Sequence, residues 1–220
     1  MTSGLPRLNI ITPVLRPQYL SAIYENLSEI NEFDIKWFTI FDPICASSVD
    51  EWSVQVHRAP PPQKPSRGKL SVEIAVADKT GGWGGSKRSY AISVINEGWC
   101  YFLDDDNLMH PNFPCLFRKA LDAQPDAQVI VFHQAMRDGS IRLHAAPEKM
   151  RGCHFDTGQF VIKRSFIGTV DYAPTSSPWS TIWPDVGMGD WNFIKGFWEA
   201  HPEQFHFVSE VGTYYNASRQ

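Results

Sequence analysis

The sequence WCYFLDDDN at residues 99–107 is the most informative segment of the chain for both fold and function. Its apolar first half predicts a short buried strand, which leads directly into Asp104, Asp105 and Asp106. Three adjacent carboxylates repel one another and need a cation or hydrogen-bond donors close by. Oxygen-rich clusters suit hard ions such as Mg²⁺ or Mn²⁺, and ligands of α/β proteins bind just beyond the carboxyl ends of strands. We therefore predict a divalent-metal site here, with a solvated acidic turn as the structural alternative.

The chain before this segment has the pattern of a parallel sheet. Apolar runs at residues 8–14, 35–41 and 71–78 predict strands, and apolar residues at helical spacing over 20–30 predict a helix between the first two. A strand-helix-strand order implies a right-handed crossover and parallel pairing. We interpret the short segment 54–57 as a further strand.

The second half of the chain predicts shorter elements in a mixed sheet. Helices are expected at residues 113–123 and 189–200, and strands at 129–132, 141–144, 159–163 and 205–211. We expect one domain over residues 1–220, with a nucleotide-binding half at about 7–107 and an irregular half at about 108–220. The loop at 171–185 is long and rich in Ser, Pro and Thr, and we expect it to close over a bound ligand.

Composition and charge exclude several classes of protein. The chain has 220 residues, of which 43% are hydrophobic and 13% aromatic, and this excludes a disordered protein. A net charge of −4 argues against a general nucleic-acid binder. Its four cysteines lack C-x-x-C spacing, which argues against a zinc or redox motif. No apolar run approaches the ~20 residues of a membrane span, so we expect a cytoplasmic protein.

A second motif, GGSKRSYAI at residues 84–92, places two glycines before an expected helix. We expect Ser86 to cap this helix, which then runs to about Glu97. A helix N-terminus offers free N–H groups and the positive end of the helix dipole. Lys87 and Arg88 add cations where acidic residues are usual, so we predict an anionic ligand. The alternative is a flexible surface loop with two solvated cations.

Several isolated residues complete the set of candidates. Asp42 follows the second strand and suits hydrogen bonds from a base or a ribose hydroxyl, although it also suits a turn before proline. Asp190 opens an expected helix, where it serves either as a cap or as a general base, with Asp185 in reserve. His206 and His154 are weaker candidates for a metal or phosphate contact.

The order of these motifs resembles that of the GT-A fold glycosyltransferases, in particular the family-2-type enzymes and the animal glucuronyltransferases. The resemblance extends over about residues 7–165, and YFLDDDN at 101–107 is its specific part. The other matching segments are residues 11–13, 37–42, 85–92 and 155–163. It implies an α/β fold with a Rossmann-like, mostly parallel sheet flanked by helices and a smaller mixed region on the acceptor side.

The resemblance also implies a function. A family member transfers a sugar from a nucleoside-diphosphate sugar to a hydroxyl of a carbohydrate or glycan acceptor. For this chain we favour a UDP-sugar as the donor over a GDP-sugar. The transfer usually proceeds with inversion and with Mn²⁺ or Mg²⁺ as cofactor. The alternatives that we retain are a nucleotidyltransferase acting on sugar phosphates and a non-catalytic module that binds metal or sugar.

The resemblance assigns roles to individual residues. The donor site would include Thr12, Pro13, Asp42, Lys87, Arg88, Asp104 and Asp105, with Asp42 on the base and Asp105 on the ribose. Asp106 would bind the metal ion, and Asp190 would be the catalytic base. The sequence departs from the family pattern at Ser89, where Asn is common, and at Gly189, where an acidic residue is common.

Overall fold

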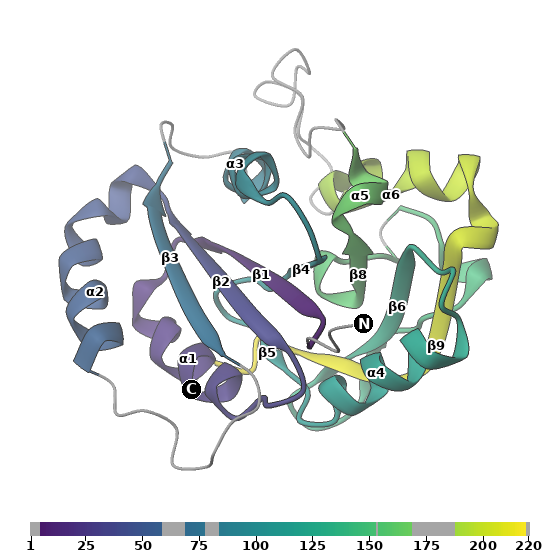
Figure 1. The fold of residues 1–220 in the computed structure, drawn as a ribbon, viewed down its shortest axis with the longest axis horizontal. Helices are drawn as coiled ribbons and strands as arrows, with labels where there is room; N and C mark the ends of the chain where they lie inside the picture. Colours follow the sequence, from purple (N-terminus) through teal and green to yellow (C-terminus); the bar gives the residue numbers. More distant parts are fainter. Residues whose placement is uncertain (1–4, 59–68, 78–83, 153, 169–187, 219–220) are drawn as a thin grey trace.

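The computed structural model describes residues 5–58, 69–77, 84–152, 154–168 and 188–218. These residues form an α/β fold, in which helices cover both faces of one mixed sheet (Figure 1). The strands are β1 (Arg7–Val14), β2 (Asp34–Phe41), β3 (Leu70–Val76), β4 (Trp99–Phe102), β5 (Leu108–Met109), β6 (Val129–Met136), β7 (Ile141–Leu143), β8 (Phe160–Lys163) and β9 (Phe205–Tyr215). The helices are α1 (Leu20–Ser28), α2 (Val49–Arg58), α3 (Gly85–Val94), α4 (Phe113–Ala123), α5 (Arg164–Ile167) and α6 (Met188–Ala200).

The first half of the sheet is parallel and has the order β3-β2-β1-β4. The chain passes outward from β1 to β3, and then returns through α3 to place β4 on the other side of β1. The strand order therefore reverses between β1 and β4. In open α/β sheets such a switch point, at the carboxyl ends of the strands, is where ligands bind.

The second half of the sheet is mixed, as expected, and continues the first without a break. β8 is antiparallel to both β4 and β6, whereas β9 is parallel to β6. The buried Tyr101 hydroxyl on β4 donates to the Gly158 carbonyl at 3.1 Å and is hydrogen-bonded to the Thr213 hydroxyl on β9. A polar contact thus joins the two halves within the core.

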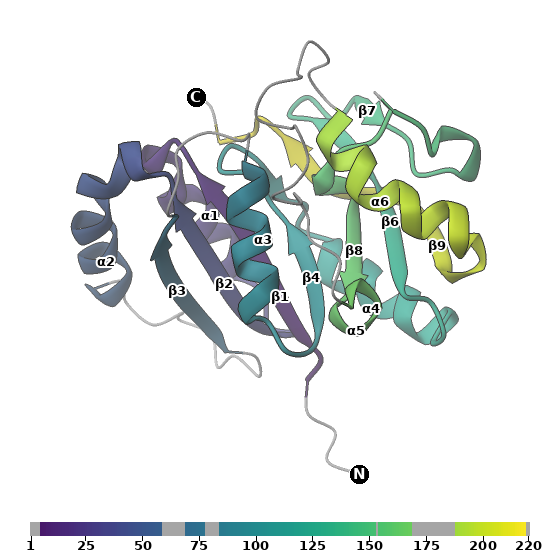
Figure 2. The same ribbon diagram turned by 90° about the horizontal axis from the view of Figure 1, so that it is seen from above.

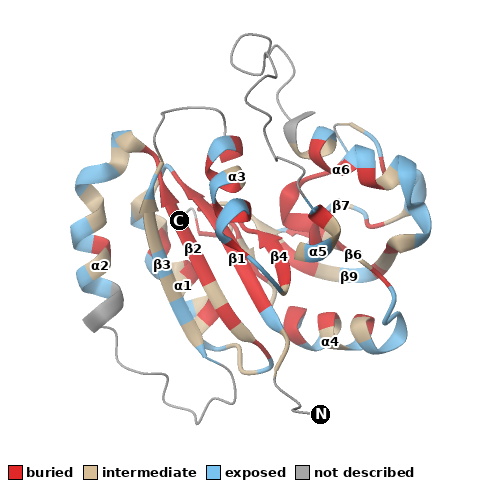
Figure 3. Cartoon of the chain, turned by 45° about the horizontal axis from the view of Figure 1, so that its top comes forward, coloured by how far each residue is buried: buried red, intermediate tan, exposed pale blue. Residues whose placement is uncertain are grey.

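The core lies on both faces of the sheet. On one face, α1, α2 and α4 bury residues such as Leu27, Trp52 and Phe117 against the strands. On the other, α3, α5 and α6 bury residues such as Ile92 and Phe193 (Figures 2 and 3). Burying a large apolar side chain contributes about 1.5–3 kcal/mol, so both helical layers hold the central strands in place.

Two expectations about local structure were wrong. Residues 54–57 belong to helix α2 and not to a strand. Its Trp52 packs edge-to-face against Trp37 of β2, with ring centroids 5.6 Å apart, so tertiary packing selects the helix. Ser86 does not cap α3, because Gly84 occupies the cap position with a left-handed φ of 86°.

The glycine at position 84 is required by space as well as by conformation. A Cβ atom there would lie 2.9 Å from Cγ of Pro13 and 3.0 Å from Nη1 of Arg88. The start of α3 is thereby pressed against the end of β1. The expected loop at 171–185 lies outside the described residues. Within the described part of the chain, no helix is long and apolar enough to cross a membrane.

Candidate functional site

The acidic segment lies at the switch point of the sheet, directly after β4. Asp105 and Asp106 are buried, with 1% and 4% of their surface exposed, whereas the Asp104 side chain is 30% exposed. Burial of an ionised carboxylate is costly unless hydrogen-bond donors or cations compensate the charge. The partners of each carboxylate therefore determine what the segment can do.

Asp105 is bound by the turn that follows β1. The backbone N–H groups of Leu15 and Arg16 each donate to Oδ2 at 2.7 Å. The Arg16 guanidinium donates to Oδ1 through Nε at 2.8 Å and also through Nη2. A carboxylate has about four acceptor positions, so these four donors fill them. Asp105 thus fastens the end of β4 to the end of β1.

Arg16 also contacts the neighbouring carboxylate. Its Nη1 lies 2.6 Å from Oδ2 of Asp106, so one guanidinium bridges two acidic side chains. Burial opposes the positive charge, but the hydrogen bonds and charges of Asp105 and Asp106 raise the pKa of Arg16. Arg16 was not among the residues predicted from the sequence. Its signal was an arginine just beyond the first strand, beside the expected ligand edge of the sheet.

The first turn of α3 brings its cations to two further carboxylates of the chain. The two cations are therefore not solvated, and the anionic ligand predicted for them stays a prediction. Lys87 Nζ lies 2.7 Å from Oδ2 of Asp42, and both side chains are almost fully buried. Arg88 forms an ion pair with Asp104. Asp42 also accepts a hydrogen bond from the Ile44 N–H at 3.1 Å, so it has the turn-forming role as well.

Two acidic residues from the second half of the chain lie near Asp104. Burial raises the pKa of Asp104 to about 7, against the opposing effect of Arg88. The negative charges of Asp156, Asp190 and Asp106 add to this rise. The fold therefore brings Asp190, the expected base, toward the acidic segment. Asp156 was not among the predicted residues.

Hydrogen bonds fix the orientation of both of these residues. Asp190 Oδ2 accepts from the Thr157 N–H at 3.2 Å. Asp156 accepts from the side chains of Gln134 and Arg142, each at 3.0 Å, and caps the short helical turn Thr157–Gln159. Because Asp156 and Asp190 meet at this turn, the second half of the chain places two carboxylates near Asp104.

Among the described residues of the site, the carboxylates outnumber the cations by two when all are ionised. A divalent metal ion would balance this excess of negative charge. The carboxylates belong to Asp42, Asp104, Asp105, Asp106, Asp156 and Asp190, and the cations to Arg16, Lys87, Arg88 and Arg142.

Buried polar atoms beside Asp106 also suit a metal ion. The Ser218 N–H donates to the Asp106 carbonyl at 3.1 Å, and the Asn216 N–H donates to Oδ1 of Asn107 at 2.9 Å. Asn216 Oδ1 and Ser218 Oγ are buried and make no hydrogen bond within the described residues. Asn107 Nδ2 is buried in the same way, but it is an N–H donor and does not bind a metal ion. Oxygen donors of this kind suit Mg²⁺ and Mn²⁺, which keep several waters and bind phosphates directly.

The histidine candidates receive no support as metal ligands. Strands β8 and β6 separate His206 of β9 from β4. His154 is exposed. Within the described residues, no group of three or more His, Cys, Asp and Glu side chains has the arrangement of a metal site, and this holds for the acidic segment as well as for the two histidines. Asp185 lies outside the described residues.

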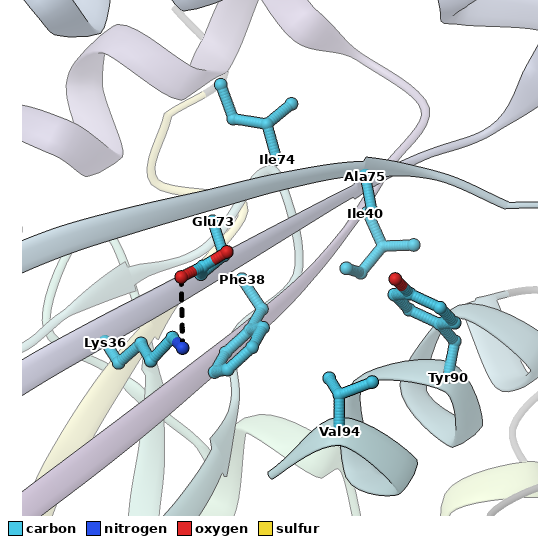
Figure 4. A pocket seen from close by; sticks show the side chains of 8 residues that line it. All are labelled: Lys36, Phe38, Ile40, Glu73, Ile74, Ala75, Tyr90 and Val94. Atoms are coloured by element: carbon cyan, nitrogen blue, oxygen red, sulfur yellow. Dashed lines mark ion pairs between the residues drawn. The ribbon is translucent and has the colours of Figure 1, made fainter.

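The remaining donor-site candidates on β1 are buried and engaged in packing. Thr12 Oγ1 accepts a hydrogen bond from the Trp37 indole at 2.9 Å, and Pro13 packs against Gly84. A separate hollow of about 240 Å³ lies between β2, β3 and α3 (Figure 4). It is smaller than the ~300–1,000 Å³ of typical ligand pockets. Its Lys36 and Glu73 form an ion pair at 3.0 Å, so we assign no ligand to it.

Comparison with known proteins identifies the fold. No protein-family model and no curated protein sequence matches the chain. Among solved structures, residues 1–349 of the glycosyltransferase S. aureus TarS match with a TM-score of 0.66 and 11% identity, over 94% of this chain and 60% of that one. The UDP complex of TarS matches with a TM-score of 0.65 and 11% identity, over 95% and 60% of the two chains.

The complex of TarS with UDP-GlcNAc gives a TM-score of 0.59 at 11% identity, over 95% of this chain and 58% of that one. The chain thus has a GT-A-like fold, as its motifs predicted. It spans 60% of the length of TarS residues 1–349. At this level of identity the likeness establishes the fold and leaves the reaction to be argued from the site.

Proposed function

We propose that the chain is a metal-dependent glycosyltransferase that uses a nucleoside-diphosphate sugar, with a UDP-sugar favoured. One observation carries this proposal: the acidic segment lies at the switch point of a GT-A-like sheet, and cations from the β1 turn and from α3 converge on it. The complexes of TarS with UDP and UDP-GlcNAc support a uridine nucleotide as donor.

On the donor side, the buried charges would be redistributed when the nucleotide binds. Asp42, at the end of β2, would accept hydrogen bonds from the base, and Arg88 would turn toward the diphosphate. Asp105 would contact the ribose only after Arg16 releases one of its acceptor positions. Charge-assisted hydrogen bonds to phosphate would offset the ion pairs that are given up.

Asp106 would hold the metal ion, together with the oxygen atoms of Asn216 and Ser218. When bound, Mn²⁺ or Mg²⁺ neutralises the diphosphate and stabilises it as a leaving group. The excess of negative charge at the site supports this assignment, because the cation that the carboxylates need would arrive with the substrate. The adjoining buried polar atoms support it independently.

On the acceptor side, we propose Asp190 as the general base. The Thr157 N–H holds one of its carboxylate oxygens, which orients the group. Asp190 would take the proton from the acceptor hydroxyl as the oxygen attacks the anomeric carbon, on the face opposite the diphosphate. Attack from that face inverts the anomeric configuration. Asp185 is the alternative base.

The proposal is tested by incubating the protein with a panel of nucleotide sugars and Mn²⁺. We expect release of a nucleoside diphosphate, and an inverted product in the anomeric proton spectrum. In a parallel incubation with nucleoside triphosphates and sugar 1-phosphates, release of pyrophosphate would favour a nucleotidyltransferase instead. Metal-dependent melting without turnover of any donor would favour a non-catalytic binding module.

A further inference from the structure

We propose that Asp156 is a positioning residue for the general base. It caps the turn Thr157–Gln159, here called the capped turn, and the first N–H of this turn orients the Asp190 carboxylate toward the acceptor hydroxyl. The inference rests on the proposed function, because it takes Asp190 to be the base. Asp156 itself contacts neither the donor nor the acceptor in this assignment.

The N–H groups of the capped turn divide between the two carboxylates. The Gly158 N–H donates to Oδ1 of Asp156 at 2.9 Å, and the Gln159 N–H donates to the Asp156 carbonyl at 3.0 Å. The Thr157 N–H instead leaves the turn and donates to Oδ2 of Asp190 at 3.2 Å. The direction of this donor, and with it the orientation of Asp190, therefore depends on the conformation of the turn.

A reciprocal pair of hydrogen bonds fixes the start of the capped turn. The Asp156 side chain caps it, and the Asp156 N–H donates in return to Oε1 of Gln159 at 3.1 Å. The side chains of Gln134 on β6 and Arg142 on β7 each donate to the Asp156 carboxylate at 3.0 Å. Arg142 also lies over the ring of Tyr215 on β9, with its guanidinium carbon 3.9 Å from the centroid. Two strands thus hold the cap, and a third strand holds one of its partners.

The middle of the capped turn is packed against the core. The Gly158 carbonyl accepts hydrogen bonds from the hydroxyls of Tyr101 on β4 and Thr213 on β9. A Cβ atom at Gly158 would lie only 2.8 Å from Nε2 of Gln134. Because the turn is held from several strands, the cap can fix the direction of the N–H that leaves it.

The helix that carries the base is fixed at the same place. Phe193 lies one helical turn after Asp190 in α6. Its ring packs against Phe102 of β4 and against Phe160, which follows the capped turn, with centroids 5.7 and 6.3 Å apart. This packing places the start of α6, and the hydrogen bond from the turn then sets the orientation of the carboxylate.

The proposal predicts different effects of two substitutions at one position. Asp156→Ala removes the cap, so kcat should fall by about 10- to 100-fold, the cost of misplacing a catalytic group by roughly 1 Å. Asp156→Asn keeps a capping oxygen, so its kcat should stay within about threefold of the wild type. Both variants remove the negative charge that raises the pKa of Asp104, so the difference between them reports the cap and not the charge. The affinity for UDP should be unchanged in both, whereas a general loss of structure would lower it.

The hydrogen bond itself can be measured without a sugar donor, by NMR of the nucleotide-free protein labelled on threonine nitrogen. The Thr157 amide proton should move downfield as the Asp190 carboxyl ionises, because a charged acceptor strengthens the bond. Asp104 and Asp156 are the other carboxyls near this group, so the step is assigned by its loss in Asp190→Asn. The same step should be lost in Asp156→Ala and kept in Asp156→Asn.

The exposed Asp138 provides a matched control. It accepts the Ser140 N–H at 2.9 Å in the turn between β6 and β7, so it is also an aspartate that stabilises a turn. Asp138→Ala should keep the wild-type kcat and the wild-type titration of the Thr157 amide. A loss in this variant would mean that the effect of Asp156→Ala is not specific to the capped turn, and would overturn the inference.

Three other results would overturn it. They are a Thr157 amide that does not follow Asp190 in the wild type, a wild-type kcat in Asp156→Ala, and an equal loss of kcat in Asp156→Asn. If Asp156→Ala does not fold, Gln159→Met removes the other half of the reciprocal pair and should show the same losses. If no donor supports transfer, the proposed function fails, while the NMR titration still decides whether the capped turn orients Asp190.

Discussion

The buried ion pair between Lys87 and Asp42 gives the sharpest prediction for stability. Nζ of Lys87 and Oδ2 of Asp42 lie 2.7 Å apart, and the two side chains are 0% and 2% exposed. Lys87→Met keeps the length of the side chain and removes its charge. It leaves the Asp42 carboxylate buried at the end of β2 without the ammonium of Lys87.

Removing one partner of a buried pair destabilises a protein by about 3–5 kcal/mol, out of a typical total of about 5–15 kcal/mol. For a chain of this size, a loss of about 3 kcal/mol corresponds to a Tm lower by about 6–12 °C. The double variant Asp42→Asn with Lys87→Met removes the uncompensated charge. It should therefore be destabilised by less than the sum of the two single variants.

Urea unfolding of the wild type, both single variants and the double variant measures these differences. Lys36→Met is the control, because Lys36 and Glu73 form an ion pair at 3.0 Å whose side chains are 37% and 56% exposed. Exposed pairs contribute about 0–1 kcal/mol. The reasoning is refuted if Lys87→Met costs no more than Lys36→Met, or if the effects in the double variant are additive.

Three further predictions concern the site and the thiols. Asp106→Asn should abolish Mn²⁺-dependent binding of UDP, measured by calorimetry, while the exposed Asp122→Asn on α4 binds as the wild type does. Asp190→Asn should lower kcat for transfer by about 10²–10⁴-fold with unchanged donor affinity, and a variant that keeps most of its rate would exclude this residue as the base. Burial raises the pKa of Cys100 to about 12, so Cys100 should resist alkylation at pH 8. The exposed Cys115 should react, and equal labelling of both by mass spectrometry would contradict the burial of Cys100.

The parallel half of the fold could be predicted because its signals are local. Strands buried on both faces appear as nearly continuous apolar runs, and residues 8–14 and 35–41 are such runs. Each structural strand begins only one residue earlier. Helix α4 has the predicted bounds of residues 113–123. In the strands and in the helix, the apolar residues that the sequence shows are the residues that the fold buries.

Helix α2 could not be recognised in the same way. A segment as short as 54–57, with the sequence VQVH, is too short for its periodicity to separate helix from strand. Its anchor, Trp52, lies before that segment and packs against Trp37 of β2. The contact that favours the helix therefore joins two elements, and it cannot be inferred from residues 54–57 alone.

The residues of the candidate site also fall into those that the sequence could predict and those that it could not. The acidic segment after β4 and the cations of α3 are contiguous motifs, so their residues could be named from the sequence. Arg16 and Asp156 acquire their roles only when the strand order places β1 beside β4 and β8 on its other side. The pairing of Lys87 with Asp42 likewise depends on how α3 packs over the sheet.

The pairing of β4 with β8 limits which parts of the protein could be exchanged in a chimaera. These strands pair directly, and the Tyr101 hydroxyl contacts Gly158 and Thr213 across the join. A chimaera that exchanges the second half for that of another protein would break the sheet in its interior. It would also leave a buried phenol without its two partners. Parts of the second half should therefore be exchangeable only through loop grafts that leave both strands intact.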